Sequence, residues 1–156
     1  MMNILIAAFL IGVVAGLRAI SAPAAVSWAT RLGLLSLGGT WLGWLGYQWT
    51  PWIFTVAALG EIINDKLPNT PSRKVPPQFI TRVLTGALSG AAIGTAHAAT
   101  VAGALLGAGG AVVGTLGGAE FRGRLVRAIG GKDLPIALLE DCITVGSAIL
   151  IVRFLL

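Results

Sequence analysis

Residues 103–118, GALLGAGGAVVGTLGG, have a glycine at almost every third or fourth position. A similar series, GALSGAAIG, occupies residues 86–94, and only a few residues around the short stretch THAAT separate the two. Residues spaced by four lie near one face of a helix, and small residues there allow two backbones to pack closely. We therefore predict two antiparallel helices packed through these glycines: Gly86, Gly90, Gly94, Gly103, Gly107, Gly110, Gly114 and Gly118.

The composition around these helices is that of a membrane protein. Of the 156 residues, 56% are hydrophobic and only 11% are charged, and the mean hydropathy is +0.88. Soluble domains have about 25% charged residues, so a water-soluble surface is excluded. Because one spanning helix needs ~20 apolar residues, the length suits a single integral membrane domain, residues 1–156.

We predict an all-α polytopic bundle of about five spans. The first is expected to kink or break at Pro23, because an interior proline removes a backbone hydrogen bond. Five tryptophan and tyrosine residues between positions 41 and 52 are typical of a membrane interface. The expected spans are residues 3–29, 51–66, 79–96, 101–118 and 135–154.

Basic residues fall mainly on one side of this layout. Eight lie on the side of the loops after the second and fourth spans, and only Arg31 and Arg153 lie on the other. Cytoplasmic loops are enriched in Lys and Arg, so we predict a cytoplasmic amino terminus and a carboxyl terminus outside. Residues 120–135 are expected to form an amphipathic segment at the inner interface. The residues on the basic side are Lys66, Arg73, Lys74, Arg82, Arg122, Arg124, Arg127 and Lys132.

The net charge of +5 follows from this asymmetry and needs no nucleic-acid partner. Membrane lipids are the predicted partners, because basic residues at the cytoplasmic surface attract anionic headgroups. The residues that we expect to contact headgroups are Arg73, Lys74, Arg122, Arg124 and Arg127.

Several ionisable residues fall inside predicted spans, among them four acids and Arg18. Such residues are rare and costly in a membrane, and they usually mark function. We expect Arg18 to reach Glu61 and pair with it, since a buried ion pair costs less than two separate buried charges. The candidate transport or ion-pair site is therefore Arg18, Glu61, Asp65, Glu140 and Asp141. In the alternative interpretation these acids only neutralise nearby basic loops, and the glycines serve packing alone.

Other chemistry has little support in the sequence. His97 stands alone and Cys142 is the only cysteine, so we predict no metal site and no cofactor. No phosphate-binding loop, dinucleotide motif or nucleophile motif occurs. Paired acids could serve an intramembrane enzyme, but no second catalytic element accompanies them.

Four stretches resemble a family of small bacterial membrane proteins labelled as domain of unknown function four-one-two-six. The resemblance covers nearly the whole chain, and its most specific part is the E-x-x-x-DK-x-P pattern at residues 61–68. It implies a bacterial inner-membrane location and brings no activity, ligand or catalytic residue. The stretches are GLRAISAPAAVSWATRLG, ALGEIINDKLPNTPSR, RVLTGALSGAAIG and ALLEDCITVGSAILIV.

Two functions are consistent with these features. The first is a transporter or channel for an ion or small polar solute, expected as a homodimer because five short spans are too few to enclose a gated path. Glu61 would be its central acidic group. The second is a structural or lipid-interacting membrane protein without transport activity.

Overall fold

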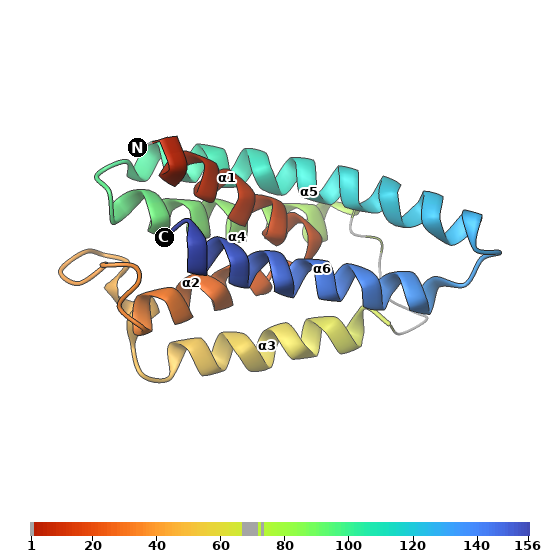
Figure 1. The fold of residues 1–156 in the computed structure, drawn as a ribbon, viewed down its shortest axis with the longest axis horizontal. Helices are drawn as coiled ribbons and strands as arrows, with labels where there is room; N and C mark the ends of the chain where they lie inside the picture. Colours follow the sequence, from red (N-terminus) through yellow and green to blue (C-terminus); the bar gives the residue numbers. More distant parts are fainter. Residues whose placement is uncertain (1, 67–71, 73) are drawn as a thin grey trace.

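The computed structural model describes residues 2–66, 72 and 74–156, and every regular element in this part of the chain is helical (Figure 1). Within these described residues, six α-helices and one short 3₁₀-helix follow each other along the sequence. They are α1 (Met2–Leu17), α2 (Ser21–Arg31), η1 (Gly43–Gly46), α3 (Thr50–Asn64), α4 (Pro76–Thr95), α5 (Thr100–Ala128) and α6 (Asp133–Phe154).

The predicted five-span bundle is wrong, although the all-α class holds. Within the described residues, only α5 and α6 are long and apolar enough to cross a membrane. Helix α1 is apolar but has 16 residues, and α2 and α3 have 11 and 15. Helix α4 has 20 residues, but its first two turns contain Pro, Gln, Thr and Arg. The apolar stretches of the sequence therefore predicted longer continuous helices than the structure has.

The first predicted span is two helices. The break lies at residues 18–20 and not at Pro23, which sits in the first turn of α2, where a missing backbone N–H costs nothing. Helices α1 and α2 run in opposite directions, and both chain ends lie at the same end of the bundle (Figure 1). The prediction that the termini lie on opposite sides is therefore wrong.

The predicted interfacial segment at residues 120–135 is not separate. Helix α5 continues to Ala128 and is followed by a turn with positive φ at Gly130 and Gly131. Glycine adopts this backbone conformation without the steric cost of a side chain. The α5–α6 hairpin extends beyond the other helices at the end opposite the termini (Figure 1).

Glycines allow the closest contacts of the core, where α5 packs against both α4 and α1. A Cβ atom on Gly86 would lie 2.7 Å from the Gly107 carbonyl oxygen, and one on Gly90 would lie 2.9 Å from the Gly107 Cα. On the other face of α5, Gly110 and Gly114 meet the backbone of α1. Two glycines of α1, Gly12 and Gly16, meet the backbone of α5 in the same way, and we did not predict them as packing residues.

The remaining predicted packing glycines divide into two groups. Gly94 and Gly103 lie against each other near the α4–α5 turn, where a Cβ on Gly94 would be 3.1 Å from the Gly103 Cα. Gly118 is half-buried, further along α5.

Large apolar side chains cover the outside of the bundle. Helix α3 exposes Trp52, Ile53, Val56, Leu59 and Ile63, and α5 and α6 expose similar rows. Several charged side chains are instead buried inside, which is the reverse of a soluble domain. Together with α5 and α6, this surface points to association with a membrane.

Candidate ion-pair site

The joint between α1 and α2 is held by a carboxylate. Helix α1 ends at Leu17 and α2 begins at Ser21, so the backbone N–H groups of Ala19 and Ile20 between them have no helical partners. The Glu61 side chain, from α3, accepts hydrogen bonds from the backbone N–H groups of Ala19 (2.8 Å) and Ile20 (2.9 Å). A negative charge at this position is favourable, because the first N–H groups of a helix carry partial positive charge.

An arginine satisfies the other side of the joint. The buried Arg82, from α4, donates hydrogen bonds to the carbonyl oxygens of Gly16 (3.0 Å) and Leu17 (2.6 Å), at the end of α1. Its Nη2 also lies 3.5 Å from Glu61 Oε1. One cation therefore binds the carbonyl end of α1 and one anion binds the N–H groups that lead into α2, and the two charges form a pair.

Arg18 is the first residue of this joint, and its side chain is fully buried. Its Nε donates a 2.9 Å hydrogen bond to Asp141 Oδ1, and its Nη1 lies 2.8 Å from Asp65 Oδ2. Lys66 Nζ contacts the other Asp141 oxygen at 2.5 Å. The expected pair of Arg18 with Glu61 is thus replaced by pairs with Asp65 and Asp141, because Glu61 is occupied by backbone N–H groups and Arg82.

Arg122 connects the network to the α5–α6 hairpin. Its guanidinium lies 2.8 Å from Asp65, 3.2 Å from Glu140 and 2.6 Å from Asp133. We predicted a contact with lipid headgroups for this residue, but its side chain is largely enclosed by these three carboxylates. Arg122 is enclosed because α5 is long, so that the residue lies near Asp65 and alongside the first turns of α6.

The structure therefore brings together all five residues of the predicted site, with partners that the sequence reasoning placed elsewhere or did not consider. Arg82, Lys66 and Arg122 were assigned to a basic surface, and Asp133 was not considered. For Arg82 a signal existed, because it lies four residues before Gly86 and so on the glycine face of α4. We call the whole set the ion network: Arg18, Glu61, Asp65, Lys66, Arg82, Arg122, Asp133, Glu140 and Asp141.

The other predicted headgroup contacts lie apart from the ion network. Arg124 is exposed and forms a 2.8 Å pair with Glu120 one turn earlier. Lys74 and Arg127 are also exposed. Arg73 lies outside the described residues.

Asp65 follows the last residue of α3, outside the two helices that can cross a membrane. Burial raises its pKa, but the hydrogen bond from Arg122 and the charges of Arg18 and Arg122 lower it. The pKa of Asp65 consequently lies below its usual value of 3.8. A carboxylate of this kind stabilises the folded state above its unfolded pKa, and that contribution is lost as the pH falls through the folded value.

We therefore expect the melting temperature to fall as the pH is lowered from 5 to 3, and to fall less in Asp65→Asn. Circular dichroism at 222 nm in detergent measures both curves. Glu120→Gln, which removes an exposed carboxylate outside the ion network, should follow the wild type. Parallel curves for Asp65→Asn and the wild type would show that Asp65 contributes nothing to acid sensitivity.

No known protein family, curated protein or solved structure matches the chain. The resemblance to the family of unknown function stays a prediction. Within residues 2–66, 72 and 74–156, no group of three or more His, Cys, Asp or Glu side chains is arranged to hold a metal ion.

Proposed function

We propose that this protein is an integral membrane protein of the bacterial inner membrane, with α5 and α6 crossing the bilayer. The exposed apolar rows on α3, α5 and α6 would face lipid, and the buried charges would be shielded from it by the helices. A water-soluble fold accounts for neither the exposed apolar surface nor the buried charged side chains.

The proposed orientation differs from the one predicted from sequence. The end of the bundle with the ion network also holds the exposed cations Lys74, Arg124, Arg127 and Lys132, whereas Arg31 and Arg153 end helices that run toward the opposite end. By the positive-inside rule the ion network end would face the cytoplasm. Both termini and the tryptophan-rich segment would then lie outside.

The proposed activity is transport of an ion or small polar solute. The observation that carries it is the short joint between α1 and α2, whose free backbone groups bond to the charged side chains of Glu61 and Arg82 in an apolar bundle. A helix break within a membrane needs replacement partners for every freed backbone group. Transporters use such breaks at their binding sites, where helix ends and charged groups meet the cargo.

The pairing pattern of the ion network supports the same proposal. Asp65 contacts both Arg18 and Arg122, and Asp141 contacts both Arg18 and Lys66. Because partners are shared, one contact can open while each charge keeps another. Side-chain exposure rises from 1% at Arg18 to 54% at Asp133, so the ion network leads from the interior to the surface at one end.

We further propose that the working unit is a homodimer. The grooves between α6 and helices α1, α2 and α3 are lined mostly by apolar side chains, so they offer no polar path through one chain. A second copy would supply the other wall of a path that begins at the ion network.

The test is flux into proteoliposomes loaded with the pH dye pyranine, under a potassium diffusion potential and with a panel of cations and anions outside. We expect Glu61→Gln to reduce flux at least tenfold, because the neutral side chain no longer pairs with Arg82 or carries a proton. Glu120→Gln is the matched control and should transport like the wild type.

Folding must be compared in the same preparations, because Glu61 also holds the α1–α2 joint. Circular dichroism spectra and gel-filtration profiles should match between wild type and Glu61→Gln. Wild-type flux in folded Glu61→Gln would show that Glu61 is not part of the transport path. Absence of any flux in the folded wild type would contradict transport itself.

A specific observation favours a second candidate, a lipid-binding structural protein. The end of the α5–α6 hairpin exposes Arg124, Arg127 and Lys132 beside the apolar side chains of Phe121 and Ile129. This mixture suits the interface of an anionic membrane. The candidate predicts no flux of any species, together with reduced anionic-lipid binding when Arg124 and Arg127 are neutralised.

A further inference from the structure

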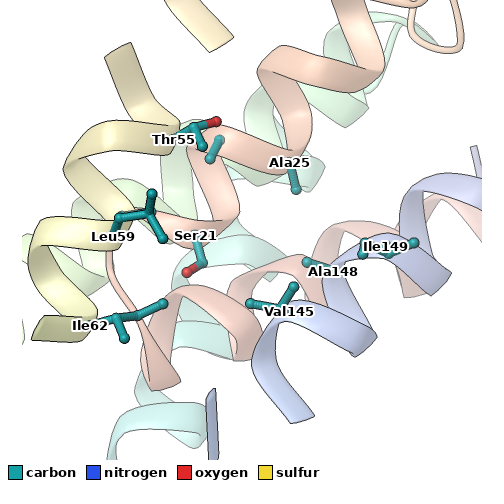
Figure 2. Close-up of a pocket in the computed structure, with 10 residues that line it drawn as sticks. Ser21, Ala25, Thr55, Leu59, Ile62, Val145, Ala148 and Ile149 are labelled. Carbon is teal, nitrogen blue, oxygen red and sulfur yellow. The ribbon is translucent and has the colours of Figure 1, made fainter. Parts of the chain in front are cut away.

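An apolar groove lies between helices α2, α3 and α6. It begins beside the ion network, since it is lined by Ser21 and by Ile62, whose carbonyl oxygen accepts a hydrogen bond from Lys66. Figure 2 shows its walls, with Leu59 and Ile62 on α3 facing Val145 and Ile149 on α6, and Ser21 on α2 between them. The cavity has a volume of about 230 Å³. Its polar lining is limited to two hydroxyl groups, and one of these, from Thr55, already bonds to Pro51 and Trp28.

A second cavity of about 300 Å³ continues this groove along α6. The two cavities share Ala25, Ala148 and Ile149, so they lie next to each other along α6, and we call them together the α6 groove. Since α2 and α6 both run away from the ion network, the groove leads toward the opposite end of the bundle. It reaches Trp28 and Leu32 there and ends at Arg153.

Arg153 gives the groove a charged end. It is exposed, and within the described residues no carboxylate pairs with it. The surrounding end of the bundle exposes Trp41, Tyr47, Trp49 and Trp52, a set of side chains typical of the headgroup region of a membrane. A cation at that level attracts an anionic headgroup, while the apolar walls below suit a hydrocarbon chain.

We propose that the α6 groove binds an anionic lipid, with one acyl chain along the groove and the headgroup phosphate at Arg153. A single acyl chain is an unbranched apolar rod, which suits small apolar cavities of about 230 and 300 Å³. This inference requires only the membrane location and is independent of transport.

The test uses delipidated protein in dodecyl maltoside, titrated with dioleoyl phosphatidylglycerol and, separately, with dioleoyl phosphatidylcholine. Native mass spectrometry counts the lipids that each chain retains. We expect one retained phosphatidylglycerol per chain, and at least a tenfold weaker affinity in Ala25→Leu and in Ile149→Trp, which fill the groove from opposite walls. Ala102→Leu, on the exposed face of α5, is the matched control and should bind like the wild type.

The charged end is tested separately. Arg153→Gln should weaken phosphatidylglycerol binding about fivefold, the effect of one cation near an anionic headgroup, and leave phosphatidylcholine binding unchanged. Arg31→Gln removes the same charge from an exposed residue that does not line the groove, and it should change neither. Phosphatidylglycerol with brominated acyl chains should also quench wild-type tryptophan fluorescence more than that of Trp28→Phe, because Trp28 lines the groove.

Equal retention of phosphatidylglycerol by the wild type and both groove-filling variants would overturn the proposal. So would a dimer that dissociates in Ala25→Leu and Ile149→Trp while lipid retention stays constant, because a second copy would then cover the groove. Neither result depends on a flux measurement. The lipid-binding proposal can therefore be contradicted while the transport function stands, and the reverse also holds.

Discussion

Replacing Arg18 by methionine is expected to destabilise the fold strongly, so that little folded protein is recovered. Arg18 is fully buried and contacts both Asp65 and Asp141, so its loss leaves two carboxylates with too little positive charge beside them. Breaking a buried ion pair by removing one partner costs about 3–5 kcal/mol. That is a large part of the stability of a chain of this size. The yield of monodisperse protein on gel filtration and the melting temperature by circular dichroism measure the effect.

Two further variants separate charge from other effects. Arg31→Met removes an exposed arginine from the end of α2 and should melt like the wild type. The double variant Arg18→Met, Asp141→Asn should recover part of the lost stability, because it removes one of the carboxylates that Arg18 compensated. A melting temperature for Arg18→Met equal to that of Arg31→Met would show that the ion network does not stabilise the fold.

The composition of the ion network could be predicted from the sequence in part, but its pairing could not. A charged residue in an apolar stretch stands out in any sequence, which is why Arg18, Glu61, Asp65, Glu140 and Asp141 were grouped. The predicted pairing of Arg18 with Glu61 assumes that each lies on one continuous helix. The break at residues 18–20 changes this geometry, since it exposes backbone N–H groups for which Glu61 is the nearest acceptor.

The break itself has no strong local signal. Pro23 is the residue in this stretch that is expected to interrupt a helix, because proline lacks a backbone N–H. The first turn of α2 nevertheless tolerates it. What stabilises the break lies far away in sequence, on Glu61 of α3 and Arg82 of α4. A local propensity argument cannot anticipate such partners, because they meet only after the helices have packed.

Glycine spacing was more informative than hydropathy. The distances between Gly86, Gly90 and Gly107 follow directly from the four-residue spacing and the short turn between α4 and α5. Hydropathy counts apolar residues but does not distinguish a continuous span from two shorter helices in a folded-back arrangement. The number of spans was therefore wrong, although the packing partners of α4 and α5 follow from the sequence.

Gly107→Ala is expected to destabilise the fold, and Gly109→Ala, two residues away on the same helix, is expected to stabilise it. A Cβ on Gly107 would lie 3.0 Å from the Gly90 Cα and would come closer still to the Gly86 carbonyl, both of them rigid backbone atoms of α4. Helices α4 and α5 would have to separate, at a cost of about 1–3 kcal/mol for overpacking. A Cβ on Gly109 meets nothing within 4 Å, so only the higher helix propensity of alanine, about 1 kcal/mol, remains.

The two alanine variants therefore distinguish backbone packing from helix propensity by the sign of the change. Propensity alone predicts a higher melting temperature for both, since each replaces a glycine within α5. Packing through glycine predicts opposite signs, with Gly107→Ala lower by about 2–10 °C, as expected for a chain of this size. Thermal unfolding by circular dichroism in one detergent resolves that difference. An increase in both variants would mean that α4 and α5 do not approach each other through Gly107, and the contact between these two helices would have to be assigned to other residues.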